Sequence, residues 1–82
     1  MFHKIKNVMP LPDYRLSVRF SEGCTKIYDV KPLFDKIPSF AELKAGNRFE
    51  DIHIDVGGNG IVRNNRIDLS YEELWDNGIL EV

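Results

Sequence analysis

The chain has 82 residues, of which 43% are hydrophobic and 29% are charged; these values argue against disorder and predict one domain spanning residues 1–82. Its 11 lysines and arginines nearly balance 13 aspartates and glutamates, so the net charge of −2 excludes a global basic field for holding nucleic acid or an anionic membrane. Cys24 is the only cysteine, and no apolar run approaches the length of a membrane span, which together predict a cytoplasmic protein without disulfides.

Two strands are expected at the start of the chain. Residues 5–9 form a short first strand, which Pro10 and Pro12 stop because proline cannot continue a central strand. Residues 14–20 alternate strictly between apolar and polar side chains, as a half-buried strand does. The inward residues are Tyr14, Leu16, Val18 and Phe20, and the outward residues are Arg15, Ser17 and Arg19.

A third strand is expected over residues 24–30. Gly23 suits the left-handed position of a short hairpin loop, so this strand pairs back antiparallel onto its predecessor. Tyr28 and Val30 compete with Ile27 for the core side, and the pattern leaves both facings open.

The middle of the chain is predicted to be helical but broken. Pro32 suits the first position of a short turn over residues 33–35, and Pro38 ends that turn. Ser39 and Glu42 have the S-x-x-E spacing of a capping box, in which each side chain accepts a hydrogen bond from the other residue's amide. Phe40 and Leu43 share one apolar face, and Gly46 stops the helix.

Residues 50–56 alternate again and predict a strand with Ile52, Ile54 and Val56 inward and Asp51, His53 and Asp55 outward. The glycine-rich residues 57–60 then form a loop, and residues 61–63 return as a strand. A tight turn at Asn64-Asn65 follows, because asparagine tolerates positive φ.

The last predicted element is a capped helix. Ser70 is the expected N-cap and forms a second capping box with Glu73, while the Asp68 carboxylate accepts amide hydrogen bonds near the helix start. Gly78 is expected to take the left-handed position that ends the helix, which folds Ile79 back onto the helix. The apolar residues of this segment are Leu69 and Leu74, at staple spacing, and the stripe of Tyr71, Leu74 and Trp75.

The predicted order is β-β-β-α-β-β-α. It defines an α+β fold, with a small, mainly antiparallel sheet of about five strands and short helices packed on it.

Four short motifs follow one another along the chain, each occurring once. They are Tyr14-x-Leu16-x-Val18-x-Phe20-Ser21-x-Gly23, then Tyr28-Asp29-Val30-x-Pro32-Leu33, then Phe40-x-x-Leu43 with Phe49, and finally Ile67-Asp68-Leu69-Ser70-x-Glu72-x-Leu74. Together they cover nearly the whole chain and resemble a bacterial family catalogued as domain of unknown function 2442. The chain departs from the family pattern at Arg63, where tryptophan is frequent, and near Arg66, where glycine is common.

The resemblance implies a small α+β domain, sometimes fused to a helix-turn-helix domain. It also implies genes that often neighbour another small protein, in pairs suspected of being toxin–antitoxin-like. It implies no established activity and no assigned catalytic residues.

Three groups of residues are candidates for a catalytic, metal-binding or phosphate-binding site. Cys24 with a distant histidine is better explained as a packed thiol than as a nucleophile with its base. His53 and Asp55 share a strand face, but a metal site needs three or four ligands. The glycine-rich loop lacks the Gly-Lys-Ser/Thr sequence and following helix of a phosphate-binding loop. We therefore predict no catalytic residues, no cofactor and no metal site.

The basic residues form the candidate interaction surface: Arg15, Arg19, Lys26, Arg63 and Arg66. Our leading hypothesis is a non-enzymatic protein-interaction module that binds another small protein, or a second copy of itself through a sheet edge. The alternative is a nucleic-acid-associated regulatory domain acting within a complex, although outward aromatic residues for stacking bases are missing beside Arg15 and Arg19. A small enzyme, which would need a cleft with convergent polar groups, is the third hypothesis.

Overall fold

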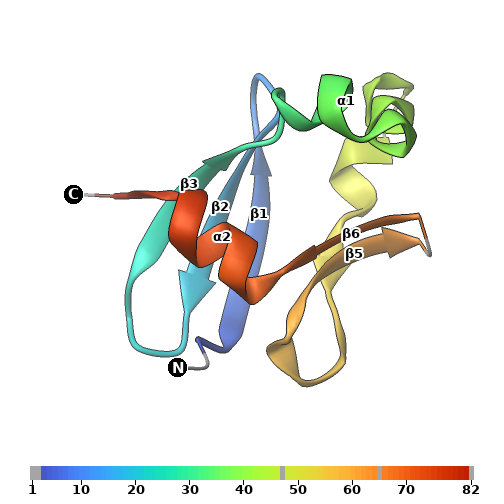
Figure 1. The fold of residues 1–82 in the computed structure, drawn as a ribbon. Helices are drawn as coiled ribbons and strands as arrows, with labels where there is room; N and C mark the ends of the chain where they lie inside the picture. Colours follow the sequence, from blue (N-terminus) through green and yellow to red (C-terminus); the bar gives the residue numbers. More distant parts are fainter. Residues whose placement is uncertain (1–2, 47, 65, 82) are drawn as a thin grey trace.

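Two antiparallel sheets and several short helices make up the computed structural model of the protein, which describes residues 3–46, 48–64 and 66–81 (Figure 1). The first sheet has the order β1-β2-β3-β7, formed by β1 (Ile5–Leu11), β2 (Arg15–Phe20), β3 (Thr25–Asp29) and β7 (Ile79–Leu80). The second has the order β4-β5-β6, formed by β4 (His53–Ile54), β5 (Gly60–Asn64) and β6 (Ile67–Ser70). The α+β prediction is confirmed, with the strands divided between two sheets.

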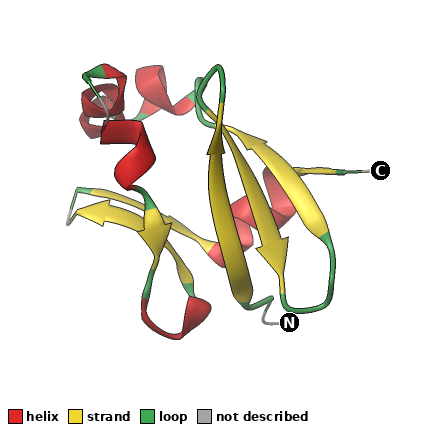
Figure 2. Cartoon of the chain, turned by 180° about the vertical axis from the view of Figure 1, so that it is seen from behind, coloured by secondary structure: helices red, strands yellow, loops and turns green. Residues whose placement is uncertain are grey.

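The helices are short, and of them α2 covers one side of the first sheet (Figure 1). The two α-helices are α1 (Leu33–Lys36) and α2 (Tyr71–Asn77), and the 3₁₀ helices are η1 (Pro38–Lys44), η2 (Arg48–Asp51) and η3 (Val56–Gly58). Helix α2 lies against the four-stranded sheet, and η1 and η2 lie over the β5–β6 hairpin, beside one end of that sheet (Figures 1 and 2). The other side of the four-stranded sheet has no helix over it (Figure 2).

Strand β1 continues beyond the predicted stop. It runs through Pro10 to Leu11, which is possible because β1 is an edge strand and proline's missing N–H costs no ladder hydrogen bond on the free side. The turn to β2 uses the left-handed conformation at Asp13 and Tyr14, with φ of 66° and 56°. Tyr14 is therefore a turn residue rather than the first residue of β2.

The alternation in β2 is confirmed, since Leu16, Val18 and Phe20 are fully buried. The register also decides the facing of β3. Tyr28 pairs with Leu16 and is buried, whereas Ile27 pairs with Ser17 on the opposite face.

The predicted capping box at Ser39 is wrong. Helix η1 has Ile37 as its N-cap and Pro38 at its start, so Ser39 already lies inside the helix and makes no cap. The physical reason is that both side chains have tertiary partners. The Ser39 hydroxyl donates to the carbonyl oxygen of Arg66 at 2.8 Å, and the Glu42 carboxylate binds arginines of the second sheet.

The strand predicted over residues 50–56 is mostly absent. Only His53–Ile54 is extended, with 3₁₀ turns on both sides. Val56 was expected to face the core but is 88% exposed. Asp55 explains this break, because its carboxylate accepts from the Val56 N–H at 2.7 Å and starts η3. Asn65 lies outside the described residues.

The start of α2 follows the prediction in part. Ser70 is the N-cap, and its hydroxyl accepts from the Glu73 N–H at 3.3 Å. The Glu73 carboxylate does not return to Ser70. It accepts from the Tyr28 hydroxyl at 2.7 Å, because α2 packs directly over β3. Asp68 has no capping role, since it is an exposed residue of β6 paired with Val62.

The end of α2 differs from the prediction. Gly78 is extended, with φ of −75° and ψ of 152°, rather than left-handed. Glycine is required here by space: a Cβ atom would lie 2.5 Å from the Leu74 carbonyl oxygen and 3.0 Å from the Lys26 Cβ. The extended backbone carries Ile79 into β7, where it pairs with Ile27 and is 75% exposed instead of folding back onto α2.

Both sheets contribute to one hydrophobic core. It includes, from the first sheet, Ile5, Leu16, Val18, Phe20 and Tyr28; from the second, Ile61, Ile67 and Leu69; and from the helices, Leu33, Phe40, Leu43, Phe49 and Leu74. Tyr71 and Trp75 pack against this core, as their spacing with Leu74 predicts.

Candidate functional site

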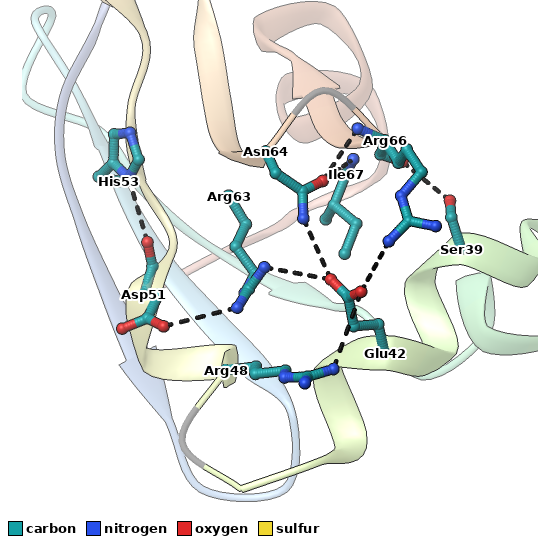
Figure 3. A network of polar contacts seen from close by, with 9 residues as sticks. All are labelled: Ser39, Glu42, Arg48, Asp51, His53, Arg63, Asn64, Arg66 and Ile67. Atoms are coloured by element: carbon teal, nitrogen blue, oxygen red, sulfur yellow. Dashed lines mark hydrogen bonds and ion pairs between the residues drawn. The ribbon is translucent and has the colours of Figure 1, made fainter.

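The carboxylate of Glu42 is the centre of a polar cluster that joins η1 to the β5–β6 hairpin (Figure 3). One oxygen, Oε2, accepts from Arg63 Nη1 and Asn64 Nδ2, both at 3.1 Å. The other, Oε1, accepts from Arg66 Nη2 at 2.9 Å and lies 3.8 Å from Arg48 Nη1. We call Glu42, Arg48, Arg63, Asn64 and Arg66 the Glu42 cluster.

Because the Glu42 cluster is largely buried, its ion pairs hold η1 and the β5–β6 hairpin together. The side chains of Glu42 and Arg63 are only 20% and 19% exposed, so their charges are largely removed from water. A second carboxylate, that of Asp51, lies 3.7 Å from Arg63 Nη2. Arg63 Nε is buried without a hydrogen-bond partner among the described residues, which fits a guanidinium held by its two terminal nitrogens. Ion pairs of this kind lock two elements together because removing one partner strands the other charge.

The turn between β5 and β6 is built into the same cluster. The side-chain oxygen of Asn64 accepts from the N–H groups of Arg66 at 2.9 Å and Ile67 at 3.1 Å, which fixes the turn that presents Arg66 to Glu42. Of the predicted interaction surface, Arg63 and Arg66 are therefore engaged within the chain. Both arginines therefore serve internal structure.

The second basic region is the helix-free side of the four-stranded sheet, which we call the open face. Its residues, identified by the strand register, are Asn7, Met9 and Leu11 of β1, Arg15, Ser17 and Arg19 of β2, Thr25, Ile27 and Asp29 of β3, and Ile79 of β7. All of them are exposed or half-buried, in contrast to the buried residues that alternate with them. Figure 2 views this side, with α2 behind the sheet.

An apolar row crosses the open face. The register aligns Met9 with Ser17, Ser17 with Ile27, and Ile27 with Ile79, so three aliphatic side chains and one hydroxyl lie in line across four strands. Met9 and Ile79 are 55% and 75% exposed. The row is therefore apolar at three of its four positions, with the small Ser17 between Met9 and Ile27, and its apolar side chains are aligned rather than scattered over the surface.

Arginines flank this row on both sides. Arg15 pairs with Asp29 across the strands, but among the described residues its side chain hydrogen-bonds only the carbonyl oxygen of Pro12, to which Nε donates at 3.3 Å. The side chain of Arg19 forms no hydrogen bond or ion pair with any residue that the structure describes. The open face thus presents two guanidinium groups that form no ion pair with a described carboxylate, although Arg15 is near enough to Asp29 to help lower the pKa of that carboxyl.

Asp29 is already engaged by Lys31. Its Oδ1 lies 3.1 Å from Lys31 Nζ and accepts from the Lys31 N–H at 3.0 Å. Desolvation alone would raise the pKa of Asp29, but these hydrogen bonds outweigh it, so the pKa of Asp29 lies below its usual value. The hydrogen bond to Asp13, followed by that to Asp29, raises the pKa of Lys31.

Lys26 does not belong to the open face, which corrects its predicted position beside Arg15 and Arg19. It pairs with Val18 and so points to the covered side, beneath α2. Its Nζ lies 4.2 Å from the centre of the Trp75 ring and donates to the Trp75 carbonyl oxygen. This ammonium hydrogen-bonds a carbonyl group in the last turn of α2, where the helix dipole favours a cation.

The histidines and the cysteine considered as catalytic residues have contacts of a structural kind. His3 stacks on Trp75 at 3.6 Å between ring centres and its Nδ1 lies 2.6 Å from Glu22. His53 Nδ1 contacts the Asp51 carbonyl oxygen at 3.0 Å, and Cys24 is half-buried in the β2–β3 loop. The described residues hold no group of three or more His, Cys, Asp or Glu side chains placed to bind a metal ion.

The fold and these surfaces define the class of protein. It is a small antiparallel α+β domain that has an internal ion-pair network, the Glu42 cluster, and a sheet face without a covering helix, the open face. The chain belongs to the family described as "Protein of unknown function (DUF2442)", whose model matches residues 5–79. Comparisons with curated proteins and with solved structures give no match. Among the described residues, no helix combines the length and apolarity needed to cross a bilayer.

Sequence reasoning found Arg15 and Arg19 but missed the apolar row between them. The row depends on β7, a strand of two residues, and on the pairing register of β1. The sequence does contain an apolar pair after Gly78, Ile79 and Leu80, which could have indicated a short strand, but a helix-ending rule assigned Ile79 to the core instead.

Proposed function

We propose that the protein is a non-enzymatic protein-interaction module that binds its partner across the open face. The observation that supports this is the apolar row through Met9, Ile27 and Ile79, flanked by Arg15 and Arg19. An apolar centre with arginine beside it is the composition that protein interfaces favour, and arginine is enriched among the residues that dominate binding energy. A partner would present aliphatic side chains to the row and carboxylates to the arginines.

The chemistry of the face favours protein over nucleic acid. Single-stranded nucleic acid is held by stacking bases on aromatic rings, and the described residues of the open face include no aromatic side chain. The first candidate partner is another small protein, encoded nearby as the family resemblance implies. The lone Cys24, which has no disulfide partner in the chain, fits a cytoplasmic setting.

The test is capture from a lysate of the source organism, read by quantitative mass spectrometry. The bait proteins are the wild type, Arg19→Glu and the matched control Lys44→Glu, which reverses an exposed charge on η1. We expect at least one protein to be retained by the wild type and the control but reduced about tenfold or more by Arg19→Glu, since like charges oppose each other across the contact. Identical retention by all three baits would overturn the open face as the binding surface.

A further inference from the structure

Strand β7 covers only part of the free edge of β3. The two strands pair at Lys26 with Leu80 and at Ile27 with Ile79, and before Ile79 the chain turns away into α2. Asp29 therefore belongs to β3 but has no neighbouring strand on the β7 side. An edge of this kind exposes backbone groups that can pair with another strand.

The direction of the Asp29 backbone groups follows from the alternation of hydrogen-bonded pairs in antiparallel sheets. On the β2 side, Phe20 N–H donates to Cys24 and Val30 N–H donates to Tyr14, so the even-numbered residues of β3 bond to β2. On the other side, Glu81 N–H donates to the carbonyl oxygen of Thr25, an odd-numbered residue.

Asp29 is odd-numbered like Thr25. Its N–H and C=O therefore point away from β2, into the space beyond the start of β7.

A groove occupies this space. It has a volume of about 500 Å³ and is lined, among others, by Arg15, Ile27, Asp29, Leu33, Lys36 and Ile79. Its walls come from both sides of the sheet edge, since Arg15, Ile27 and Ile79 belong to the open face while Leu33 and Lys36 belong to α1. An extended segment lying here would direct alternate side chains to these two walls.

The charges around the groove are net positive, because Arg15, Lys31 and Lys36 outnumber Asp29 and Glu73. Asp29 is bound by Lys31, whereas Glu73 accepts from the neutral Tyr28 hydroxyl and keeps its charge. Arg15 and Lys36 form no ion pair with a described carboxylate. Electrostatic complementarity therefore selects an acidic occupant, and the aliphatic walls select aliphatic side chains between the acids.

We propose that the groove beside Asp29 binds an extended peptide segment of alternating aliphatic and acidic residues, as an added strand in line with β7. The Asp29 N–H and C=O supply the backbone hydrogen bonds, and Arg15 and Lys36 receive the carboxylates. Strand addition of this kind takes affinity from the backbone and specificity from alternate side chains. The inference rests on the proposed function in that the occupant comes from a protein partner.

The direct test is a titration of the isotope-labelled full chain with acetyl-Val-Asp-Val-Asp-Val-Asp-amide, followed by amide NMR. We expect the Asp29 amide resonance to shift with saturation and its hydrogen exchange to slow about tenfold or more, because a new acceptor protects it. The matched peptide with lysine in place of aspartate should bind at least about tenfold more weakly. N-methylation of alternate peptide residues should weaken binding by a similar factor.

A charge-swapped protein separates recognition from misfolding. The double variant Arg15→Glu/Lys36→Glu changes exposed side chains only, and its dispersed amide spectrum reports that it is folded. We expect it to prefer the lysine peptide, whereas the control Lys44→Glu keeps the wild-type preference for the aspartate peptide.

Several results would overturn the proposal. They are an Asp29 amide that no peptide moves up to its solubility limit, equal binding of the acidic and basic peptides, and protection of Asp29 by self-association in concentrated peptide-free samples. Stronger perturbation by a DNA or RNA oligonucleotide would overturn it as well. If Asp29 does not respond while Arg19→Glu still loses a captured protein, the peptide groove fails and the open face stands. If Asp29 responds but capture is insensitive to Arg19→Glu, the reverse holds.

Discussion

The Glu42 cluster and the open face are two basic regions with opposite arrangements. In the cluster, three arginines gather around one carboxylate that is only 20% exposed, and their charges are used within the molecule. On the open face, Arg15 and Arg19 lie beside an apolar row and form no ion pair with a described carboxylate, although Arg15 helps to lower the pKa of Asp29 across the strands. The difference shows that an arginine count does not locate a binding surface. What matters is whether a carboxylate of the same chain reaches the guanidinium.

The largest expected effect comes from breaking the cluster. Glu42→Ala removes the common acceptor of Arg63, Asn64 and Arg66 and leaves the half-buried Arg63 beside Asp51 alone. We expect the free energy of unfolding to fall by about 2–4 kcal/mol, measured by urea denaturation followed by far-ultraviolet circular dichroism. The control is Glu50→Ala, an exposed carboxylate of η2, which should change it by about 0.5 kcal/mol or less. Equal losses of stability from the two changes would show that the Glu42 cluster does not hold η1 and the hairpin together.

A smaller effect is expected where α2 is bound to β3. Tyr28→Phe removes the hydrogen bond to Glu73 and should lower the free energy of unfolding by about 1–2 kcal/mol at neutral pH. Burial, followed by the bond to Glu73, raises the pKa of Tyr28 above its usual value of 10.0, so the unfolded chain loses this proton first as pH rises.

The wild type should therefore lose stability above about pH 10, where the unfolded tyrosine ionises. Tyr28→Phe should lose less over the same range. Urea midpoints recorded from pH 8 upward test this, and parallel curves for the two proteins would contradict it.

Asp29→Asn tests the edge of the open face at acid pH. Because the pKa of folded Asp29 is lowered by Lys31, the unfolded state binds the proton more readily, and the stability from this carboxylate is present above the usual value of 3.8. It is lost as the pH falls below that value toward the folded pKa. The wild type should thus lose more stability than Asp29→Asn when urea midpoints are compared between pH 5 and pH 2.5. If the variant and the wild type lose the same stability between pH 5 and pH 2.5, Lys31 does not stabilise the ionised carboxylate of Asp29.

The smallest effect on stability is expected from Arg15→Ala and Arg19→Ala. Neither guanidinium is bound by a described carboxylate, so each change should alter the free energy of unfolding by no more than about 0.5 kcal/mol. Thermal denaturation of the two variants beside Glu42→Ala makes the comparison in one experiment. A loss above about 1 kcal/mol from either change would place that arginine in the structure rather than on a binding surface.

Local sequence patterns predicted an element correctly where its tertiary contacts favour the same structure. Strict alternation identified the buried side of β2, and Ser70 is a cap because nothing else competes for its hydroxyl. Ser39 and Glu42 have the same spacing as Ser70 and Glu73, yet they form no box, since partners distant in sequence offer Glu42 stronger charged bonds. Such competition is invisible in a short window of sequence.

The site was less predictable than the fold for a geometric reason. Which residues share the open face depends on the pairing register, and a shift of one residue would exchange its two sides. Lys26 shows this, because its charge suggested the open face while its pairing with Val18 places it beneath α2. A helix-ending rule predicted a left-handed Gly78, whereas the glycine is extended and is required by its close packing against Leu74 and Lys26.

The pairing of β7 with β3 also has a consequence for the order of folding. The first three strands are consecutive hairpins, which need only short loops to close and so form early. Ile79 must find Ile27 across a loop of about 50 residues, a closure that costs more entropy and therefore comes late. Until then the whole edge of β3 is open to other chains. The nascent or partly folded protein is accordingly most prone to aggregate through the same edge that, once β7 has docked, is narrowed to a single groove.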